Sequence, residues 1–127
     1  LSVPDLMPTL LSLMALPDAT PRGIDGRDLS NTITTGTGLR PDMQLYLSTP
    51  REARESRGVR TSTHTLAIEW HRNKPATYLF DNVADPYQMR NLADEEPALA
   101  GELRGRLAQM LEQTADPAKE RLLATNG

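Results

Sequence analysis

The chain has 127 residues, a net charge of −3 at neutral pH, 38% hydrophobic residues and only 4% aromatic residues. This length is enough for one domain of ordinary size. The negative charge argues against a nucleic-acid or anionic-membrane partner, because both require a concentrated basic surface. The low aromatic content indicates a domain that rests against something larger.

The sequence contains no cysteine, which excludes disulfides, thiolate metal sites and a cysteine nucleophile. The compartment stays open, because many exported bacterial proteins also lack cysteine, and a periplasmic or secreted location is compatible with the sequence. No apolar run approaches the roughly 18–20 residues needed to cross a bilayer. The chain begins at Leu1, without a methionine and directly before a helix signal, so we expect a cut chain.

Residues 2–16 carry the signals of a helix. Ser2 is a capping residue, Pro4 lies in the first turn, and Asp5 follows the cap in the capping-box position. Pro8 removes a backbone donor, so we expect a distorted first turn or a later start. Apolar side chains at the helical spacing predict one buried stripe. The stripe consists of Leu6, Leu10, Leu13 and Met14.

A long segment, residues 18–41, is rich in Gly, Pro, Thr and Asp. It predicts a loop with a tight turn at Asp25-Gly26 and a short helical turn at 28–33. A loop of this length is unusual within a compact domain, and such loops usually lie over a neighbouring surface.

The middle of the chain predicts an antiparallel sheet of three to four strands. The first strand is expected at 43–48, with a charged loop at 49–58 after it. A second strand begins at Val59, and 65–70 alternates cleanly between apolar and polar side chains. After a hairpin loop, 77–81 returns as another strand.

The last part predicts a capped turn and a closing helix. Asp85 is a cap with proline after it and Gln88 in the capping-box position, so we expect one helical turn ending near Asn91. A helix over 97–114 has an apolar face at the 3.6-residue period. That face consists of Leu99, Leu103, Leu107, Met110 and Leu111. The order of elements is typical of an α+β fold.

Three blocks, in this order and spacing, resemble the C-terminal third of sulfatases of the alkaline-phosphatase superfamily. The first, at 5–11 and 25–29, is similar to the family's Asp-Leu-x-Pro-Thr-Leu-Leu helix and the Asp-Gly-x-x-Leu turn after it. The second, at 58–61, resembles the family's Val-Arg-Thr strand. The third, at 79–93, is similar to the signature Leu-Tyr-Asp-Leu-x-x-Asp-Pro-x-Glu-x-x-Asn-Leu. Phe80 replaces the tyrosine of this signature, and a glutamine replaces its glutamate.

The resemblance implies two parts. Residues 1–40 would be the terminal helix and connecting loop of an α/β catalytic domain, and 41–127 a C-terminal subdomain with a small antiparallel sheet and an amphipathic helix. This subdomain would support the catalytic domain and line the substrate cleft. The implied partners are the catalytic domain of the same parent chain and a sulfated small molecule or sugar.

The parent enzyme's implied reaction is hydrolysis of a sulfate ester, in which a formylglycine hydrate attacks sulfur and calcium stabilises the charge on the sulfate oxygens. The formylglycine of sulfatases arises from a Cys/Ser-x-Pro/Ala-x-Arg motif. The nearest imitation starts at Ser48 and has Glu52 where the arginine belongs. Asp85 is interpreted as a cap and Asp94 as an acid near a helix start. We therefore predict no catalytic residue, metal ligand or cofactor in this chain, which should be inactive alone.

Arginines recur every third residue through the predicted charged loop and into the strand after it, at 51, 54, 57 and 60. Arginine forks bind sulfate as well as they bind phosphate or carboxylate. Arg60 falls in the Val-Arg-Thr match and is interpreted as a structural partner. Two interpretations stay open for this segment: a solvated loop with internal ion pairs, or contacts from Arg54 and Arg57 to an anionic substrate. His64 is either a strand-end residue or a third contact in the substrate cleft. His71 lies seven residues after His64, and in a continuous strand the two histidines would face opposite sides.

The sequence leaves two alternatives open. The parent could be a phosphodiesterase or phosphonate hydrolase, because these relatives share the same C-terminal pattern. The chain could instead be a free-standing binding module, which predicts no exposed apolar patch. A docked fragment should expose Leu6, Leu10 and Leu13 and tend to associate.

Overall fold

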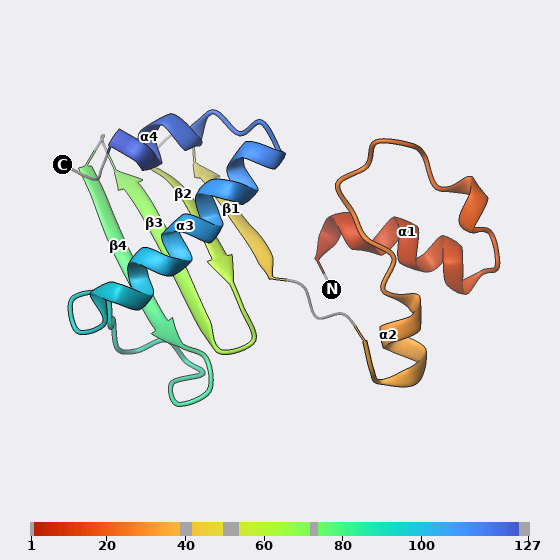
Figure 1. Ribbon diagram of the computed structural model, residues 1–127, viewed down its shortest axis with the longest axis horizontal. Coiled ribbons are helices and arrows are strands. Elements are labelled where there is room, and N and C mark those ends of the chain that lie inside the picture. Colours follow the sequence, from red (N-terminus) through yellow and green to blue (C-terminus); the bar gives the residue numbers. More distant parts are fainter. Residues whose placement is uncertain (1, 39–41, 50–53, 72–73, 125–127) are drawn as a thin grey trace. The chain divides into compact units, whose positions relative to one another are not determined.

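The computed structural model (Figure 1) describes residues 2–38, 42–49, 54–71 and 74–124. It divides into two compact units, Leu1–Pro41 and Asp42–Gly127. No helix in the described part of the chain is long and apolar enough to span a membrane.

The first unit consists of helix α1, a 3-10 turn and a short helix α2. These elements span Val3–Leu13, Pro17–Ala19 and Ser30–Thr35. Helix α1 begins at Val3, directly after Ser2, and contains Pro8 in its interior. The helix therefore begins at the predicted cap, and the alternative of a later start was wrong. Pro8 lacks the N–H that would bond the carbonyl of Pro4, and Gly26 of the following loop packs against this carbonyl.

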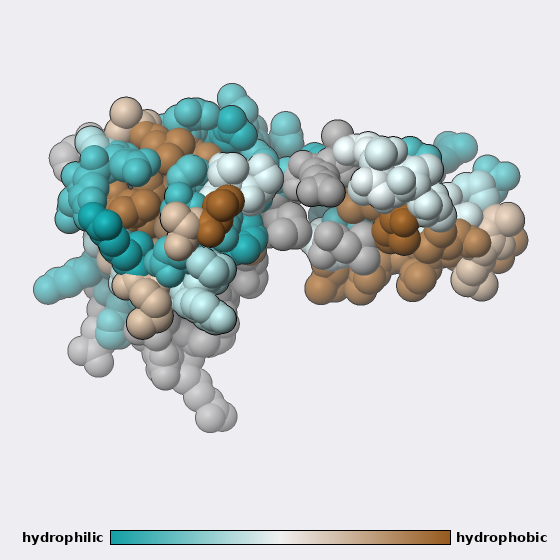
Figure 2. Space-filling model, turned by 90° about the horizontal axis from the view of Figure 1, so that it is seen from below, coloured by the Kyte–Doolittle hydropathy of each residue, from teal (hydrophilic) through white to brown (hydrophobic). Residues whose placement is uncertain are grey.

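The predicted stripe of α1 is not buried. Leu6, Leu10, Leu13 and Met14 are 43–65% exposed, whereas Asp5 and Thr9 are 6% and 1% exposed. The helix turns its polar side towards its own loop because Asp5 and Thr9 hydrogen-bond to that loop, which leaves the apolar side uncovered. Figure 2 shows hydrophobic atoms, in brown, gathered along one side of this unit.

The second unit contains a four-stranded antiparallel sheet with strand order β1-β2-β3-β4. The strands are Met43–Thr49, Arg54–Arg60, His64–His71 and Lys74–Asp81. The predicted α+β class and sheet are thereby confirmed. The charged loop was predicted too long, because residues 54–58 already form the first half of β2. Ladder pairing with β1 and β3 holds this polar segment in the extended conformation.

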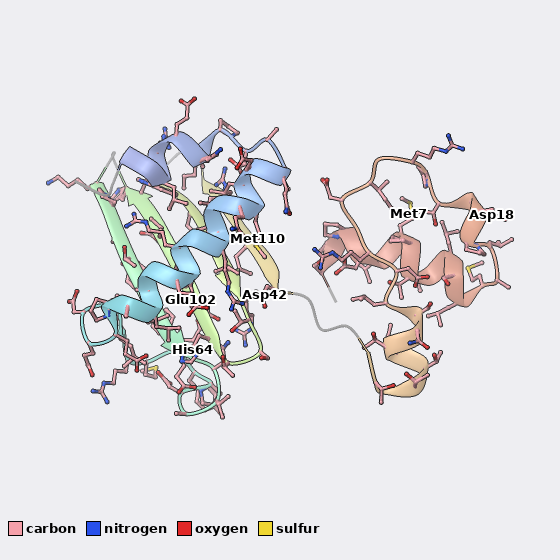
Figure 3. All side chains as sticks on the ribbon, viewed as in Figure 1. Met7, Asp18, Asp42, His64, Glu102 and Met110 are labelled. Atoms are coloured by element: carbon pink, nitrogen blue, oxygen red, sulfur yellow. The ribbon has the colours of Figure 1, made fainter. Side chains whose placement is uncertain are left out.

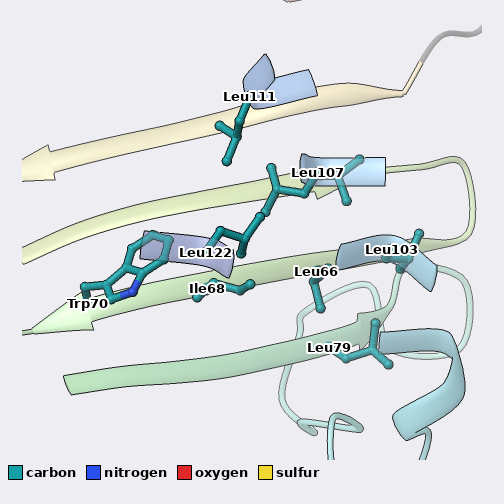
Figure 4. Close-up of a cluster of buried hydrophobic side chains, with 9 residues drawn as sticks. Leu66, Ile68, Trp70, Leu79, Leu103, Leu107, Leu111 and Leu122 are labelled. Atoms are coloured by element: carbon teal, nitrogen blue, oxygen red, sulfur yellow. The ribbon is translucent and has the colours of Figure 1, made fainter. Parts of the chain in front are cut away.

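Two helices cover one face of the sheet, α3 (Pro97–Gln113) and α4 (Ala118–Ala124) (Figure 1). The predicted helix matches α3, whereas α4 was not predicted. The apolar faces of both helices pack onto β2, β3 and β4, as Figure 4 shows. The buried core consists of Val59, Leu66, Ile68, Trp70, Leu79, Leu103, Leu107, Leu111 and Leu122. Burial of each such side chain contributes about 1.5–3 kcal/mol.

Candidate functional site

The three residues predicted to contact substrate lie along two neighbouring strands. Arg54 begins β2 and pairs with His71, whereas Arg57 pairs with Ile68 and His64 with Asp81. Ile68 and His64 are four positions apart in β3, roughly 13 Å at the usual rise of a strand. The strands therefore do not bring the three residues into one cluster. The side chain of Arg54 lies outside the described part of the structure.

Arg57 is an internal residue of the sheet, only 2% exposed. Its Nε donates to Asp116 Oδ2 at 2.6 Å and its Nη2 to Asp116 Oδ1 at 3.2 Å. Nη2 also donates to Glu55 Oε1 at 2.8 Å, and Nη1 donates to the carbonyl of Ser56 at 3.0 Å. Glu55 in turn pairs with Arg121 of α4. This network joins β2 to the segment between α3 and α4.

The network shifts the titration of both members of the central pair. Burial lowers the pKa of Arg57, but the hydrogen bond and the charge of Asp116 outweigh burial and raise it. The hydrogen bond from Arg57 lowers the pKa of Asp116 despite burial, with help from the N–H of Ala118. Both groups are therefore charged near neutral pH. No local pattern indicated this pair, because Asp116 lies just beyond the helix predicted over 97–114, 59 positions from Arg57.

His64 begins β3 at the other end of the sheet, where Figure 3 labels it. Its ring Nδ1 lies 2.9 Å from Thr63 Oγ1, and its backbone N–H donates to Thr61 Oγ1 at 2.9 Å. The side chain is partly exposed. His64 follows the turn that connects β2 to β3. Its position is therefore fixed both by hydrogen bonds within this turn and by its pairing with β4.

The Val-Arg-Thr segment and the end of β4 share a polar cluster beside this turn. Arg60 Nη1 donates to Thr65 Oγ1 at 3.0 Å, and Thr65 Oγ1 donates to Asn82 Oδ1 at 2.7 Å. Asn82 Nδ2 then donates to the carbonyl of Thr61 at 3.3 Å. Thr65 is 4% exposed. Arg60 thus has a structural partner within the sheet, as its place in the motif suggested.

The loop after β4 is a series of turns, and the expected helical turn at 85–91 is absent from it. Asp81 Oδ1 accepts the N–H of Val83 at 2.7 Å and that of Ala84 at 2.9 Å. These hydrogen bonds lower the pKa of Asp81. Asp85 Oδ2 accepts the N–H of Arg90 at 2.8 Å. The helical turn fails because Gln88 adopts a left-handed conformation, with φ of 55°.

Asn91 fastens the far end of this loop to the outer edge of β4. Its Oδ1 accepts the N–H groups of Leu79 at 2.8 Å and Ala93 at 3.1 Å. Its Nδ2 donates to the carbonyl of Thr77 at 3.0 Å, and the N–H of Leu92 donates to the carbonyl of Leu79 at 2.8 Å. The Asn-Leu pair of the signature is therefore a structural clamp.

The two motif segments of the first unit are likewise joined by hydrogen bonds. Asp5 Oδ1 accepts the N–H of Arg27 at 2.9 Å, and Asp5 Oδ2 accepts the N–H of Ser2 at 2.9 Å. Thr9 Oγ1 accepts the N–H of Leu29 at 3.0 Å and donates to the carbonyl of Arg27 at 3.3 Å. Burial would raise the pKa of Asp5, but its hydrogen bonds with Ser2 and Arg27 lower it overall. These motif residues hold the helix and the loop together.

Among the described residues, no group of three or more His, Cys, Asp or Glu side chains could hold a metal ion. Ser48, the start of the imperfect nucleophile motif, lies in β1, and the rest of that motif from residue 50 falls outside the described ranges. The polar groups described above bond mainly to other groups of their own unit. These hydrogen bonds and ion pairs hold the helices, strands and loops of each unit together.

No protein-family model matches the chain. Two sulfatases are related to it in sequence. The chain is 32% identical to an endo-4-O-sulfatase of Bacteroides thetaiotaomicron, across 92% of this chain and 26% of that enzyme. It is also 32% identical to an ulvan-active sulfatase of Formosa agariphila, across 95% of this chain and 24% of that enzyme. The chain thus spans about a quarter of the length of these curated relatives.

Solved structures agree with the sequence relatives. A protein of Bacteroides fragilis, described as a sulfatase, superposes with a TM-score of 0.82 at 31% identity, across 93% of this chain and 26% of that one. A 2-O GAG sulfatase superposes with a TM-score of 0.75 at 22% identity, across 91% of this chain and 26% of that one. The second similarity shows the fold alone.

Proposed function

Because the chain corresponds to the C-terminal portion of a sulfatase, we propose that it supports the catalytic domain of a sulfuric ester hydrolase and lines its substrate cleft. The nucleophile and the metal site would belong to the catalytic domain, where formylglycine and calcium would supply the chemistry. The substrate of the whole enzyme would be a sulfated small molecule or sugar. Residues 1–40 would then belong to the end of the catalytic domain, and 41–127 would form the C-terminal subdomain.

The exposed apolar side of α1 is the observation that carries this proposal. Val3 is 81% exposed, Leu10 54% and Met14 65%. Monomeric soluble proteins rarely leave a large continuous apolar surface in water. The polar side of the same helix is already used, because Asp5 and Thr9 bond to residues 27–29. An apolar side left open in this way fits an end element of a larger domain better than it fits a free-standing binding module.

The substrate contacts are a separate part of the proposal. His64 is partly exposed at the end of the sheet, and Arg54 begins the strand that carries Arg57. We propose that each of them contacts an anionic group in the cleft, at separate points, because Arg54 pairs with His71 at the opposite end of β3 from His64. Arg57 would serve as a positioning residue, because its guanidinium is engaged by Asp116 and Glu55. The Arg57 pair would keep β2, and therefore Arg54, in place.

The decisive experiment compares the 127-residue chain with the complete gene product. We expect the coding sequence upstream of Leu1 to encode a Cys/Ser-x-Pro/Ala-x-Arg motif, and the complete protein to hydrolyse an aryl sulfate. The isolated chain should not. Turnover by the isolated chain that is lost in Ser48→Ala would refute the proposal. Faster turnover of an aryl phosphate diester or phosphonate than of the sulfate would assign the parent to the phosphodiesterase or phosphonate hydrolase class.

A further inference from the structure

A short loop of the second unit presents apolar side chains to the solvent. Val83 is 71% exposed, and Tyr87 and Met89 are each 85% exposed. They are the three large apolar side chains that are more than 70% exposed among those of this unit whose exposure the structure describes. We call the segment 82–90, which follows β4, the tip loop. Three such side chains within one short loop indicate a contact surface.

The tip loop is held in one conformation by polar side chains within it and at its two ends. Asp81 binds two N–H groups at its start, and Asp85 Oδ2 binds the N–H of Arg90 near its end. The N–H of Gln88 also donates to the carbonyl of Asp85 at 3.0 Å. Asn91 then fixes the chain to β4. A loop that is already ordered loses little conformational entropy on binding, and a tyrosine adds contact area at low entropic cost.

The charges of the tip loop disfavour a sulfated polymer as its partner. Arg90 is the loop's cation, and its Nη2 forms an ion pair with Glu95 Oε2 at 2.6 Å. Asp85 within the loop and Asp81 directly before it are acids that would repel sulfate groups. An uncharged, apolar protein surface fits Tyr87 and Met89 better.

We infer that the tip loop docks against an apolar recess of the catalytic domain that precedes this chain in the full-length enzyme. The inference rests on the proposed function and names a second contact surface beyond α1. The partner of the tip loop is inferred from the length of the relatives, because about three quarters of each curated relative lies outside the region matched by this chain. A rigid apolar loop of the small unit therefore has a large same-chain surface available to cover it.

Methionine oxidation in the complete protein tests this inference without relying on activity. Thioether oxidation follows solvent exposure. Hydrogen peroxide is applied to the native protein and to the same protein unfolded in guanidinium, and the oxidation rate of each methionine is read by peptide mass spectrometry. If the tip loop is docked, Met89 should be oxidised several-fold more slowly in the native protein. Near-equal rates would overturn the inference.

Met14 on α1 separates this inference from the proposed function. Protection of Met14 without protection of Met89 would leave the docked α1 in place and refute docking of the tip loop. Exposure of both methionines would refute both. Protection of Met89 that disappears on dilution would identify a second copy of the protein as the partner and would also overturn the inference.

Two variants of the complete protein provide an independent readout. Tyr87→Ser should lower its Tm, because the tyrosine would lose a buried contact. Lys119→Ser serves as a control, since this side chain forms an exposed ion pair with Glu112 on the helical side of the unit. Equal Tm values for Tyr87→Ser and the unsubstituted protein would count against docking.

Discussion

Arg57 and Asp116 are 59 positions apart in the sequence, yet Nε of Arg57 lies 2.6 Å from Oδ2 of Asp116. The side chains are only 3% and 11% exposed. This pair ties the segment after α3 to the middle of β2. A polar strand segment and a helix end, each unremarkable in sequence, thus stabilise each other.

Loss of this acid should destabilise the second unit strongly. In Asp116→Ala, Arg57 would stay buried without its main partner, and we expect the free energy of unfolding to fall by about 3 kcal/mol. Urea unfolding can be followed through Trp70, the single tryptophan of the chain. Glu102→Ala is the control, because it breaks an exposed pair with Arg106 and should cost at most about 0.5 kcal/mol. Equal losses of unfolding free energy in the two variants would show that burial of the Arg57–Asp116 pair does not increase its contribution to stability.

The same pair predicts how stability depends on pH. The pKa of Asp116 is lowered in the folded state, so its stabilising contribution is complete above the unfolded value of about 3.9. It is lost as the pH falls through the folded-state pKa, because protonation then favours the unfolded chain. The free energy of unfolding of Asp116→Asn should therefore be well below that of the unsubstituted protein at neutral pH. The two values should become equal in acid. A constant difference across urea titrations at neutral and acidic pH would be inconsistent with this linkage.

Gly26 should tolerate no side chain. A Cβ at this position would lie 1.9 Å from the carbonyl oxygen of Pro4, far inside any real contact. Gly26→Ala must push the loop away from α1 and weaken the hydrogen bonds that Asp5 and Thr9 make with it. Hydrogen exchange of the amides of Arg27 and Leu29 should therefore accelerate. Exchange rates equal to those of the unsubstituted protein would show that the loop adapts.

Two other glycines should behave in the opposite way. Gly101 and Gly105 lie in α3, and a Cβ added at either position would meet no neighbouring side chain within 4 Å. Replacing either with alanine should raise the free energy of unfolding by about 1 kcal/mol, because alanine restricts the unfolded chain and favours the helix. Urea unfolding monitored by Trp70 provides the measurement. A decrease in stability would mean that the helix surface is closely covered at that site.

Removal of the clamp at Asn91 should loosen the end of β4. Asn91→Leu removes the side-chain partner of the N–H of Leu79 and of the carbonyl of Thr77. Because these hydrogen bonds are only partly shielded from water, we expect a loss of about 1 kcal/mol. Asn91→Asp keeps an acceptor for Leu79 and Ala93 but loses the donor to Thr77. Its loss of stability should be smaller. A larger loss in the aspartate variant would assign the main role to the Thr77 bond.

Regular periodicity made much of the fold predictable. The alternation of Leu66, Ile68 and Trp70 identified the face of β3 that enters the core, and the 3.6-residue spacing identified α3. The start of α1 followed from Ser2 and Asp5. The alternation, the helical spacing and the cap each depend on residues that are close in the sequence, and they could therefore be predicted from it.

The remaining errors arose where distant contacts override local preference. The segment that contains Glu55 and Arg57 has the composition of a loop, but ladder pairing and the bond to Asp116 hold it in β2. The leucines of α1 are not buried within this chain, because Asp5 and Thr9 turn the other side of the helix inwards. Their exposure agrees with what was expected for a docked fragment. Among the predicted substrate contacts, Arg57 is the residue that the structure shows buried and bonded within the sheet. Its partner Asp116 is distant in sequence, so the residues around Arg57 did not predict the pair.

The clamp at Asn91 has a further consequence for the behaviour of the protein in concentrated solution. β4 is an outer strand of the sheet, and the free backbone groups of outer strands invite strands from other molecules. The amide of Asn91 takes the place of a peptide group along this strand, and Leu92 continues the pairing to Leu79. A signature residue of the chain thus acts as protection against intermolecular sheet growth at this edge.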